Sequence, residues 1–119
     1  MIVSHDGADA ISYEPAGGTI RLLSAPPVDG EARPAYFGAG QVRPLWGGVA
    51  MLSAFHGHLS RAHMRLIVRL LLDHGYRVLY AERTEGHTMP FATEIAEGDF
   101  RGLFRIELTE VPHRRRADA

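Results

Sequence analysis

One stretch of this chain constrains its fold more than any other: the segment from Ser60 to Gly75, which has the pattern of an amphipathic helix. Its apolar residues recur at helical spacing, at Met64, Ile67, Val68, Leu71 and Leu72. Ser60 can cap the amino end of such a helix, and Gly75 can end it in a left-handed conformation. The apolar runs on either side, residues 49–55 and 76–82, have the length of buried strands. A strand, a helix and a strand with short joints predict a βαβ unit whose two strands are parallel in one sheet.

The rest of the chain is predicted to be mostly strand. The segments with strand character are residues 10–14 and 19–23, which flank a turn, then 35–37, 41–42 and 103–110. A second helix is expected to begin at Thr88 and to end at Gly98. Together these elements predict an α+β domain with a mixed, mostly antiparallel sheet, a central βαβ unit and two main helices.

Length and composition fit one globular domain. The chain has 119 residues, of which 45% are hydrophobic and 23% are charged, so it can bury one core but not two. We expect residues 1–111 to form that domain and residues 112–119, which include three consecutive arginines, to form a flexible basic tail. The formal net charge of -1 argues against nucleic acid as the main partner.

The sequence also predicts a soluble protein of the cytoplasm. It contains no cysteine, which excludes disulfides and cysteine metal sites. The first ten residues lack a basic segment followed by an apolar run, which argues against a signal peptide. No apolar run approaches the roughly 18 residues that a membrane span requires, so no contact with a membrane is expected.

The order of the predicted elements is itself informative over residues 47–111. A long apolar strand is followed by a capped helix and a second strand, and the most telling run is Leu70-Leu71-Leu72-Asp73-His74-Gly75-Tyr76-Arg77-Val78-Leu79-Tyr80. This pattern resembles the GNAT family of N-acetyltransferases in a short and degenerate form, of a kind that also occurs among phage proteins. The resemblance implies a GNAT-like fold and an acyl-CoA-dependent N-acyltransferase with acetyl-CoA as cofactor. Its acceptor is then expected to be an amine on a small molecule or on a protein.

The joint between the long apolar strand and the helix is the expected cofactor site. In the GNAT family the cofactor pyrophosphate lies on backbone amides at the start of the central helix, and the corresponding residues here are His56, Gly57, His58, Ser60 and Arg61. A helix amino end together with a guanidinium favours a phosphate group. The joint departs from the family's Arg/Gln-x-x-Gly-x-Gly/Ala pattern, because it keeps one glycine and one arginine. The alternative interpretation is a plain strand-to-helix joint in which Ser60 acts only as the cap.

Three polar residues follow the second predicted parallel strand: Glu82, Glu85 and His87. They lie at the carboxyl end of that strand, where open α/β sheets usually place ligands. A general base that deprotonates an incoming amine is expected among these catalytic candidates. The alternative is that Glu85 and His87 are polar loop residues near the start of the second helix, where an acidic side chain is favourable.

Histidines near the joint raise the question of a metal site. His56 and His58 alternate along an extended stretch, and His63 lies one turn into the helix. No fourth ligand is evident among their neighbours in sequence, although Glu82, Glu85 or His87 could approach from the end of the neighbouring strand. The preferred interpretation is that these histidines are exposed or hydrogen-bonded, and no metal site is predicted.

A second function stays open at this point: a non-catalytic binding or assembly protein, for example a phage virion or assembly component. The apolar, glycine-rich segment 35–48, with Tyr36, Phe37 and Trp46, could then contact another chain, together with an exposed sheet edge. An oligomer or an assembly partner is expected under this hypothesis.

Overall fold

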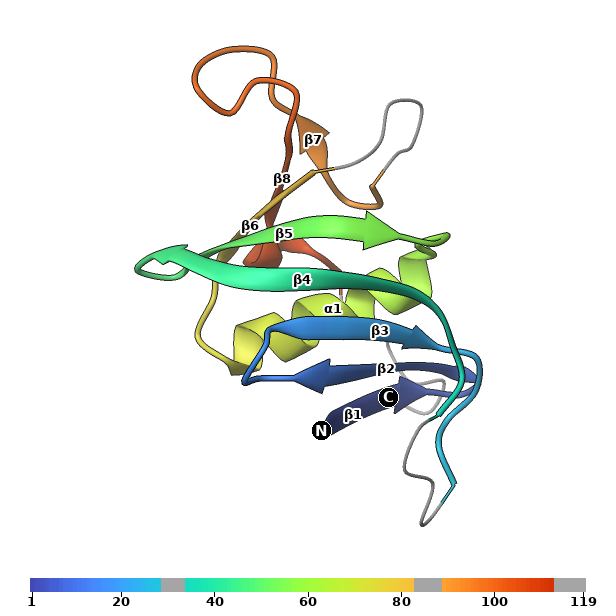
Figure 1. Ribbon diagram of the computed structural model, residues 1–119. Coiled ribbons are helices and arrows are strands. Elements are labelled where there is room, and N and C mark those ends of the chain that lie inside the picture. The colour runs from blue at the N-terminus through green and yellow to red at the C-terminus, as the bar shows by residue number, and fades with distance from the viewer. Residues whose placement is uncertain (29–33, 83–88, 113–119) are drawn as a thin grey trace.

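The computed structural model describes residues 1–28, 34–82 and 89–112, and in this part of the chain eight strands form one sheet with one α-helix on a single face (Figure 1). The strands are β1 (Ile2–Asp6), β2 (Asp9–Glu14), β3 (Thr19–Leu23), β4 (Tyr36–Trp46), β5 (Val49–His56), β6 (Val78–Ala81), β7 (Thr93–Glu94) and β8 (Phe104–Glu107). The helices are α1 (Arg61–Asp73) and the short 3-10 helix η1 (Leu108–Glu110).

The strands follow the order β1-β2-β3-β4-β5-β6-β8-β7 across the sheet. Strands β1 to β5 form an antiparallel meander in which each strand pairs with the next. β5 and β6 are parallel and are connected by α1, while β8 returns antiparallel to β6 and carries β7 on its outer side. The carboxyl ends of β5 and β6 therefore lie at the same end of the sheet as the amino end of α1.

Helix α1 forms because its sequence supplies an apolar face and a cap at each end. Its buried residues are His63, Met64, Leu66, Ile67, Val68, Leu70 and Leu71. Ser60 has an extended backbone and accepts a hydrogen bond from the amide of His63, which makes it the amino-terminal cap. At the other end Gly75 takes a φ of +91°, the left-handed conformation that ends a helix at low cost. The helix packs on β1, β2 and η1.

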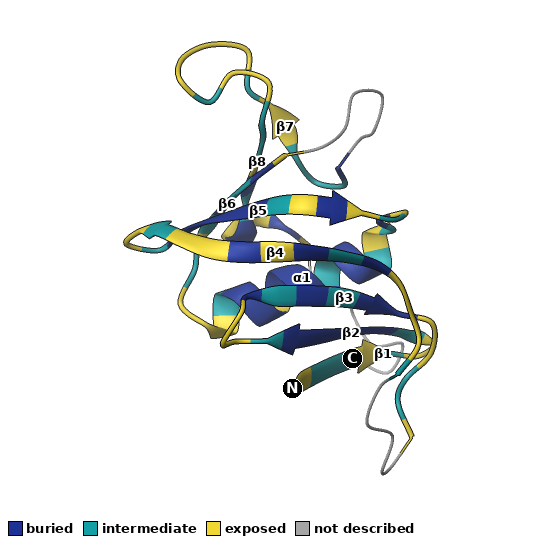
Figure 2. Cartoon of the chain, in the orientation of Figure 1, coloured by how far each residue is buried: buried dark blue, intermediate teal, exposed yellow. Residues whose placement is uncertain are grey.

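The two faces of the sheet differ in what covers them (Figure 2). The side chains that point towards α1 form the core and include Ile11, Ile20, Leu22, Leu52, Leu79 and Ile106, each no more than 1% exposed. Their neighbours along each strand point the opposite way. These neighbours include Ser12, Arg21, Met51, Tyr80 and Arg105, and we call the side on which they lie the open face.

The fold class predicted from the sequence, a GNAT-like α+β domain with a central βαβ unit and two main helices, is wrong. Of the described residues 45% lie in strands and 16% in helices, and α1 is the one α-helix among them. In the described residues a single eight-stranded sheet is the main structural element. The α1 crossover connects two of its strands, β5 and β6.

The second predicted helix is absent from its described part, residues 89–98. Phe91 has a φ of +65°, which no right-handed helix accommodates. Thr93 is β-branched and favours an extended backbone, and β7 forms there by pairing with β8. Met89 is buried and Phe91 packs against the core. These residues therefore bury their side chains without forming the apolar face of a helix. Thr88, the expected cap, lies outside the described residues.

Three strand predictions also change. β1 was not expected, and it forms by pairing with β2 along its whole length. The two expected fragments in residues 35–42 belong to one continuous strand, β4. The last predicted strand, residues 103–110, ends at Glu107 and continues as η1, where the amide of Leu108 bonds to the carbonyl of Arg77 at 2.9 Å.

Most of the expected basic tail lies outside the described residues. Of the expected tail only Pro112 is described, and the three consecutive arginines lie outside. Within the described ranges, none of the helices has the length and apolar character to cross a membrane.

Candidate functional site

The amino end of α1 is built from Ser60 and the first turn of the helix. The Ser60 hydroxyl oxygen accepts the amide of His63 at 3.1 Å, and the Ser60 carbonyl accepts the amide of Met64 at 2.9 Å. The first amides of any helix lack partners inside the helix, which here leaves the N–H groups of Arg61 and Ala62 for an outside acceptor. These two donors and the positive end of the helix dipole point to the same region of the surface.

The side chain of Ser60 also contacts His63, which connects the cap to β2. The hydroxyl oxygen of Ser60 lies 2.6 Å from Nδ1 of His63. On the other side of the ring, Nε2 lies 3.8 Å from Oδ1 of Asp9, too far for a direct hydrogen bond. The direction of this hydrogen bond depends on the imidazole tautomer: with the proton on Nε2, the hydroxyl donates to Nδ1 and Nε2–H faces the Asp9 carboxylate. The order serine, histidine, aspartate thus joins the helix start to β2.

Burial sets the charge of His63. The residue is only 7% exposed, and the ring of Phe37 packs edge-on against it with 5.3 Å between the centroids. Loss of water around the imidazole lowers the pKa of His63 below its ordinary value of 6.5; Asp9 opposes this shift and His58 adds to it. The imidazole is therefore neutral at neutral pH.

Two arginines of α1 meet one aromatic ring beside this helix end. The guanidinium of Arg61 lies 4.3 Å from the ring centroid of Phe91, and that of Arg65 lies 5.4 Å from it. Nε of Arg65 is buried without a hydrogen-bond partner among the described residues. No carboxylate of the described ranges lies within 4.0 Å of either guanidinium. Within the described part of the chain, both guanidinium groups thus contact the ring of Phe91 and have no carboxylate partner.

The remaining predicted cofactor residues line the joint between β5 and α1. His56 and His58 are exposed, at the end of β5 and in the joint. Gly57 has a φ of +105°, and a Cβ atom built on it would lie 2.7 Å from Cα of Gly38. Packing against β4 thus accounts for this glycine. Among the residues that the structure describes, no group of three or more metal-ligating side chains could hold an ion.

Of the predicted catalytic residues, Glu82 is the one that can be placed. It is exposed, and its amide donates to the carbonyl of Leu52 at 3.0 Å, just beyond the last paired residues of β5 and β6. Its position is therefore at the same end of the sheet as the amino end of α1. Glu85 and His87 lie outside the described residues.

Sequence reasoning missed the partners that tertiary structure brings to this helix end. Asp9 comes from β2, Phe37 from β4, and Phe91 from the segment in which a helix was expected. None of these residues carries a local sequence signal that links it to Ser60. The positive φ of Phe91 is likewise invisible in the sequence.

Comparison with known proteins finds no family model, no curated protein and no solved structure that matches this chain. The resemblance to the GNAT family therefore gains no support from these comparisons.

Proposed function

We propose that the amino end of α1 binds a phosphate-bearing ligand, with acyl-CoA as the ligand expected, and that the chain acts as an acyl-CoA-dependent N-acyltransferase-like protein. One observation carries the proposal: the free amides of the first turn and two guanidinium groups without carboxylate partners in the described ranges share one helix end. Helix amides and arginine together are favourable donors for a phosphate oxygen.

The residues at this end are compatible with a pyrophosphate. Leu59, just before the cap, is 4% exposed, so its side chain packs inward and does not cover the amides. His58, before Leu59, and Arg61, after the cap Ser60, are both exposed. The Ser60 and His63 side chains themselves carry no negative charge, and the Asp9 carboxylate lies on the far side of the His63 ring from Ser60.

The acyl-transfer step would use Glu82 as the proton acceptor. When bound, acyl-CoA supplies a thioester carbonyl that an amine can attack directly. In that reaction a C–N bond would form, the C–S bond would break with its electron pair leaving on the CoA thiolate, and the Glu82 carboxylate would take the proton that the amine nitrogen loses. Positioning of the amine beside the carboxylate supplies most of the acceleration in such a reaction.

Ligand-dependent thermal unfolding tests the binding part of this proposal. Acetyl-CoA at ten times its dissociation constant should stabilise the protein by about 1.4 kcal/mol, which raises the melting temperature by roughly 5 °C. Arg61→Gln should remove most of this shift. Arg69→Gln, an exposed arginine of the same helix two turns further on, should keep it. No shift with millimolar acetyl-CoA would rule the proposal out.

A transfer assay tests the enzymatic part. With a panel of primary amines, Glu82→Gln should reduce acetyl transfer by about 10²-fold to 10⁴-fold while the thermal shift with acetyl-CoA stays unchanged. Binding without measurable transfer to any amine would contradict the transferase and leave only a cofactor-binding protein.

A second candidate function has an observation in its favour. Three aromatic side chains of β4 are strongly exposed: Tyr36 at 51%, Phe37 at 44% and Trp46 at 54%. Exposed aromatic residues are typical anchors of protein interfaces, which favours a binding or assembly protein that offers β4 to another chain. Native mass spectrometry tests this candidate, because it expects an oligomer or a co-purifying chain, and a strictly monomeric species argues against it.

A further inference from the structure

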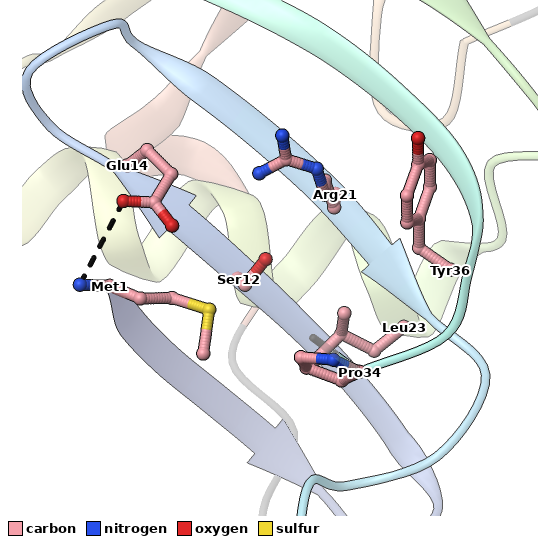
Figure 3. A pocket seen from close by; sticks show the side chains of 7 residues that line it. All are labelled: Met1, Ser12, Glu14, Arg21, Leu23, Pro34 and Tyr36. Carbon is pink, nitrogen blue, oxygen red and sulfur yellow. Dashed lines mark ion pairs between the residues drawn. The ribbon is translucent and has the colours of Figure 1, made fainter. Parts of the chain in front are cut away.

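A pocket of about 430 Å³ lies over β2 and β3 on the open face of the sheet, opposite the face that α1 covers (Figure 3). Its lining consists of Met1, Ser12, Glu14, Arg21, Leu23, Pro34 and Tyr36. The volume is within the range of small-molecule sites. Four chemical groups line it: the hydroxyl of Ser12 and the carboxylate of Glu14 from β2, the guanidinium of Arg21 from β3, and the aromatic ring of Tyr36 from the start of β4.

The lining of the pocket includes a buried hydroxyl without a hydrogen-bond partner in the described part of the chain. Ser12 is 1% exposed, and its hydroxyl oxygen has no hydrogen-bond partner among the described residues. A buried hydroxyl without a partner destabilises a fold, so its presence at the bottom of a pocket points to a ligand atom as the missing partner. In the pairing of β2 with β3, Ser12 stands directly opposite Arg21.

Arg21 places a positive charge beside that hydroxyl. Its guanidinium carbon lies 5.5 Å from the ring centroid of Tyr36, and Figure 3 shows both side chains in the lining of the pocket. The other charged side chain of the pocket, Glu14, lies 3.8 Å from the α-amino group of Met1 and not within ion-pair distance of Arg21. Within the described part of the chain, the guanidinium thus has an aromatic neighbour but no carboxylate.

We propose that this pocket binds a small organic carboxylate with an apolar body. The carboxylate accepts hydrogen bonds from the guanidinium of Arg21 and from the hydroxyl of Ser12. The apolar body lies against Tyr36, Leu23 and Pro34. A planar carboxylate matches the fork of a guanidinium, and the hydroxyl supplies one further donor.

Glu14 makes the pocket selective among anions. Its carboxylate is on the same strand as Ser12, two residues on, and so faces the same side of the sheet. A second negative charge on the ligand would be repelled by it, which disfavours a phosphate dianion relative to a carboxylate. The ligand class therefore differs from the phosphate-bearing ligand proposed for α1, and the two proposals are independent.

Binding of three matched probes, followed by calorimetry and by saturation-transfer NMR, tests the proposal. Phenylacetate should bind in a saturable way, while phenylacetamide and phenyl phosphate should bind about 10-fold more weakly or worse. Arg21→Gln should weaken phenylacetate binding by about 10-fold or more. Arg43→Gln, a matched change on the open face outside the pocket, should leave it as in the wild type.

Ser12→Ala separates a ligand contact from a purely structural role. Without ligand, this variant should melt at the same temperature as the wild type or higher, because it removes an unpartnered buried hydroxyl. Its affinity for phenylacetate should nevertheless fall by about 10-fold. The proposal is overturned if millimolar phenylacetate does not bind, if the amide binds equally well, or if Arg21→Gln and Arg43→Gln behave alike.

Discussion

His63 couples the stability of the protein to pH. Burial lowers its pKa below 6.5, while Asp9 opposes that shift and His58 reinforces it. The unfolded chain takes up a proton near pH 6.5, whereas the folded protein does so only at lower pH. The stability linked to this group is therefore full above pH 6.5 and is lost as the pH falls towards the pKa of the folded state. We expect the urea midpoint to fall between about pH 7 and pH 5 and to fall less in His63→Asn.

His74→Asn is the control variant for His63→Asn, because it also replaces one imidazole but does so at the opposite end of α1. It should retain the decline of the urea midpoint on acidification. Identical pH profiles for the wild type and His63→Asn would show that His63 is not the responsible group.

Two glycines provide a matched test of close packing. Gly57 has a φ of +105°, and a Cβ on it would lie 2.7 Å from Cα of Gly38 and 2.9 Å from the carbonyl oxygen of Phe37. Gly57→Ala should therefore destabilise the protein by about 2–4 kcal/mol, through backbone strain and overpacking. Gly47 has nothing within 4 Å of the same atom, and Gly47→Ala should change the unfolding free energy by less than about 0.5 kcal/mol. Urea unfolding of both variants measures this contrast, and equal effects would refute it.

The sequence predicts those features of the candidate site that are formed by residues adjacent in the chain. A serine before an apolar periodicity indicates a helix cap, and Arg61 follows it directly, so the sequence locates the helix end and one cation. The partners of that end could not be derived in the same way. Asp9 and Phe91 reach it only through the pairing of the sheet and the path of the segment after β6.

Among the secondary-structure elements, those with a strong local period were predicted well. The helix α1 and strands β5 and β6 lie where the apolar pattern indicated them. β4 was harder, because Gly38 and Gly40 suggested interruptions. A Cβ on Gly40 would lie 2.6 Å from Cδ2 of Phe55, so the glycine permits close packing of β4 against β5 and does not end the strand.

The cap of α1 can be tested by itself. Ser60→Ala removes the acceptor for the amide of His63 and the hydrogen-bond partner of its ring, and it should cost about 1–2 kcal/mol of unfolding free energy. Ser60→Asn should recover most of this loss, because asparagine is an equally good cap. Urea unfolding at neutral pH measures both changes. If alanine and asparagine destabilise equally, the capping interaction does not stabilise the helix.

The molecule as a whole could not be deduced from its parts. A local strand, helix and strand pattern is compatible with several fold classes, because the class depends on how many further helices cover the sheet. Residues 89–98 were expected to form the second helix that would cover the sheet. They form a turn and a short edge strand instead, because Met89 packs in the core and Phe91 packs against it. Because α1 is the one α-helix of the described residues and lies on the other face, no α-helix of this part of the chain covers the open face, which carries charged and aromatic side chains.

Trp46 reports on whether that face associates with a second copy of the chain. It is the one tryptophan of the sequence, is 54% exposed, and contacts the rings of Tyr80 and Phe100 with centroid distances of 6.3 and 6.0 Å. Association through β4 would remove water from the indole, so at high protein concentration its emission should shift to shorter wavelength and acrylamide should quench it less. Arg43→Glu, on β4, should shift this transition to higher concentration. Quenching that stays constant with concentration, together with a monomer in sedimentation, would exclude self-association through β4.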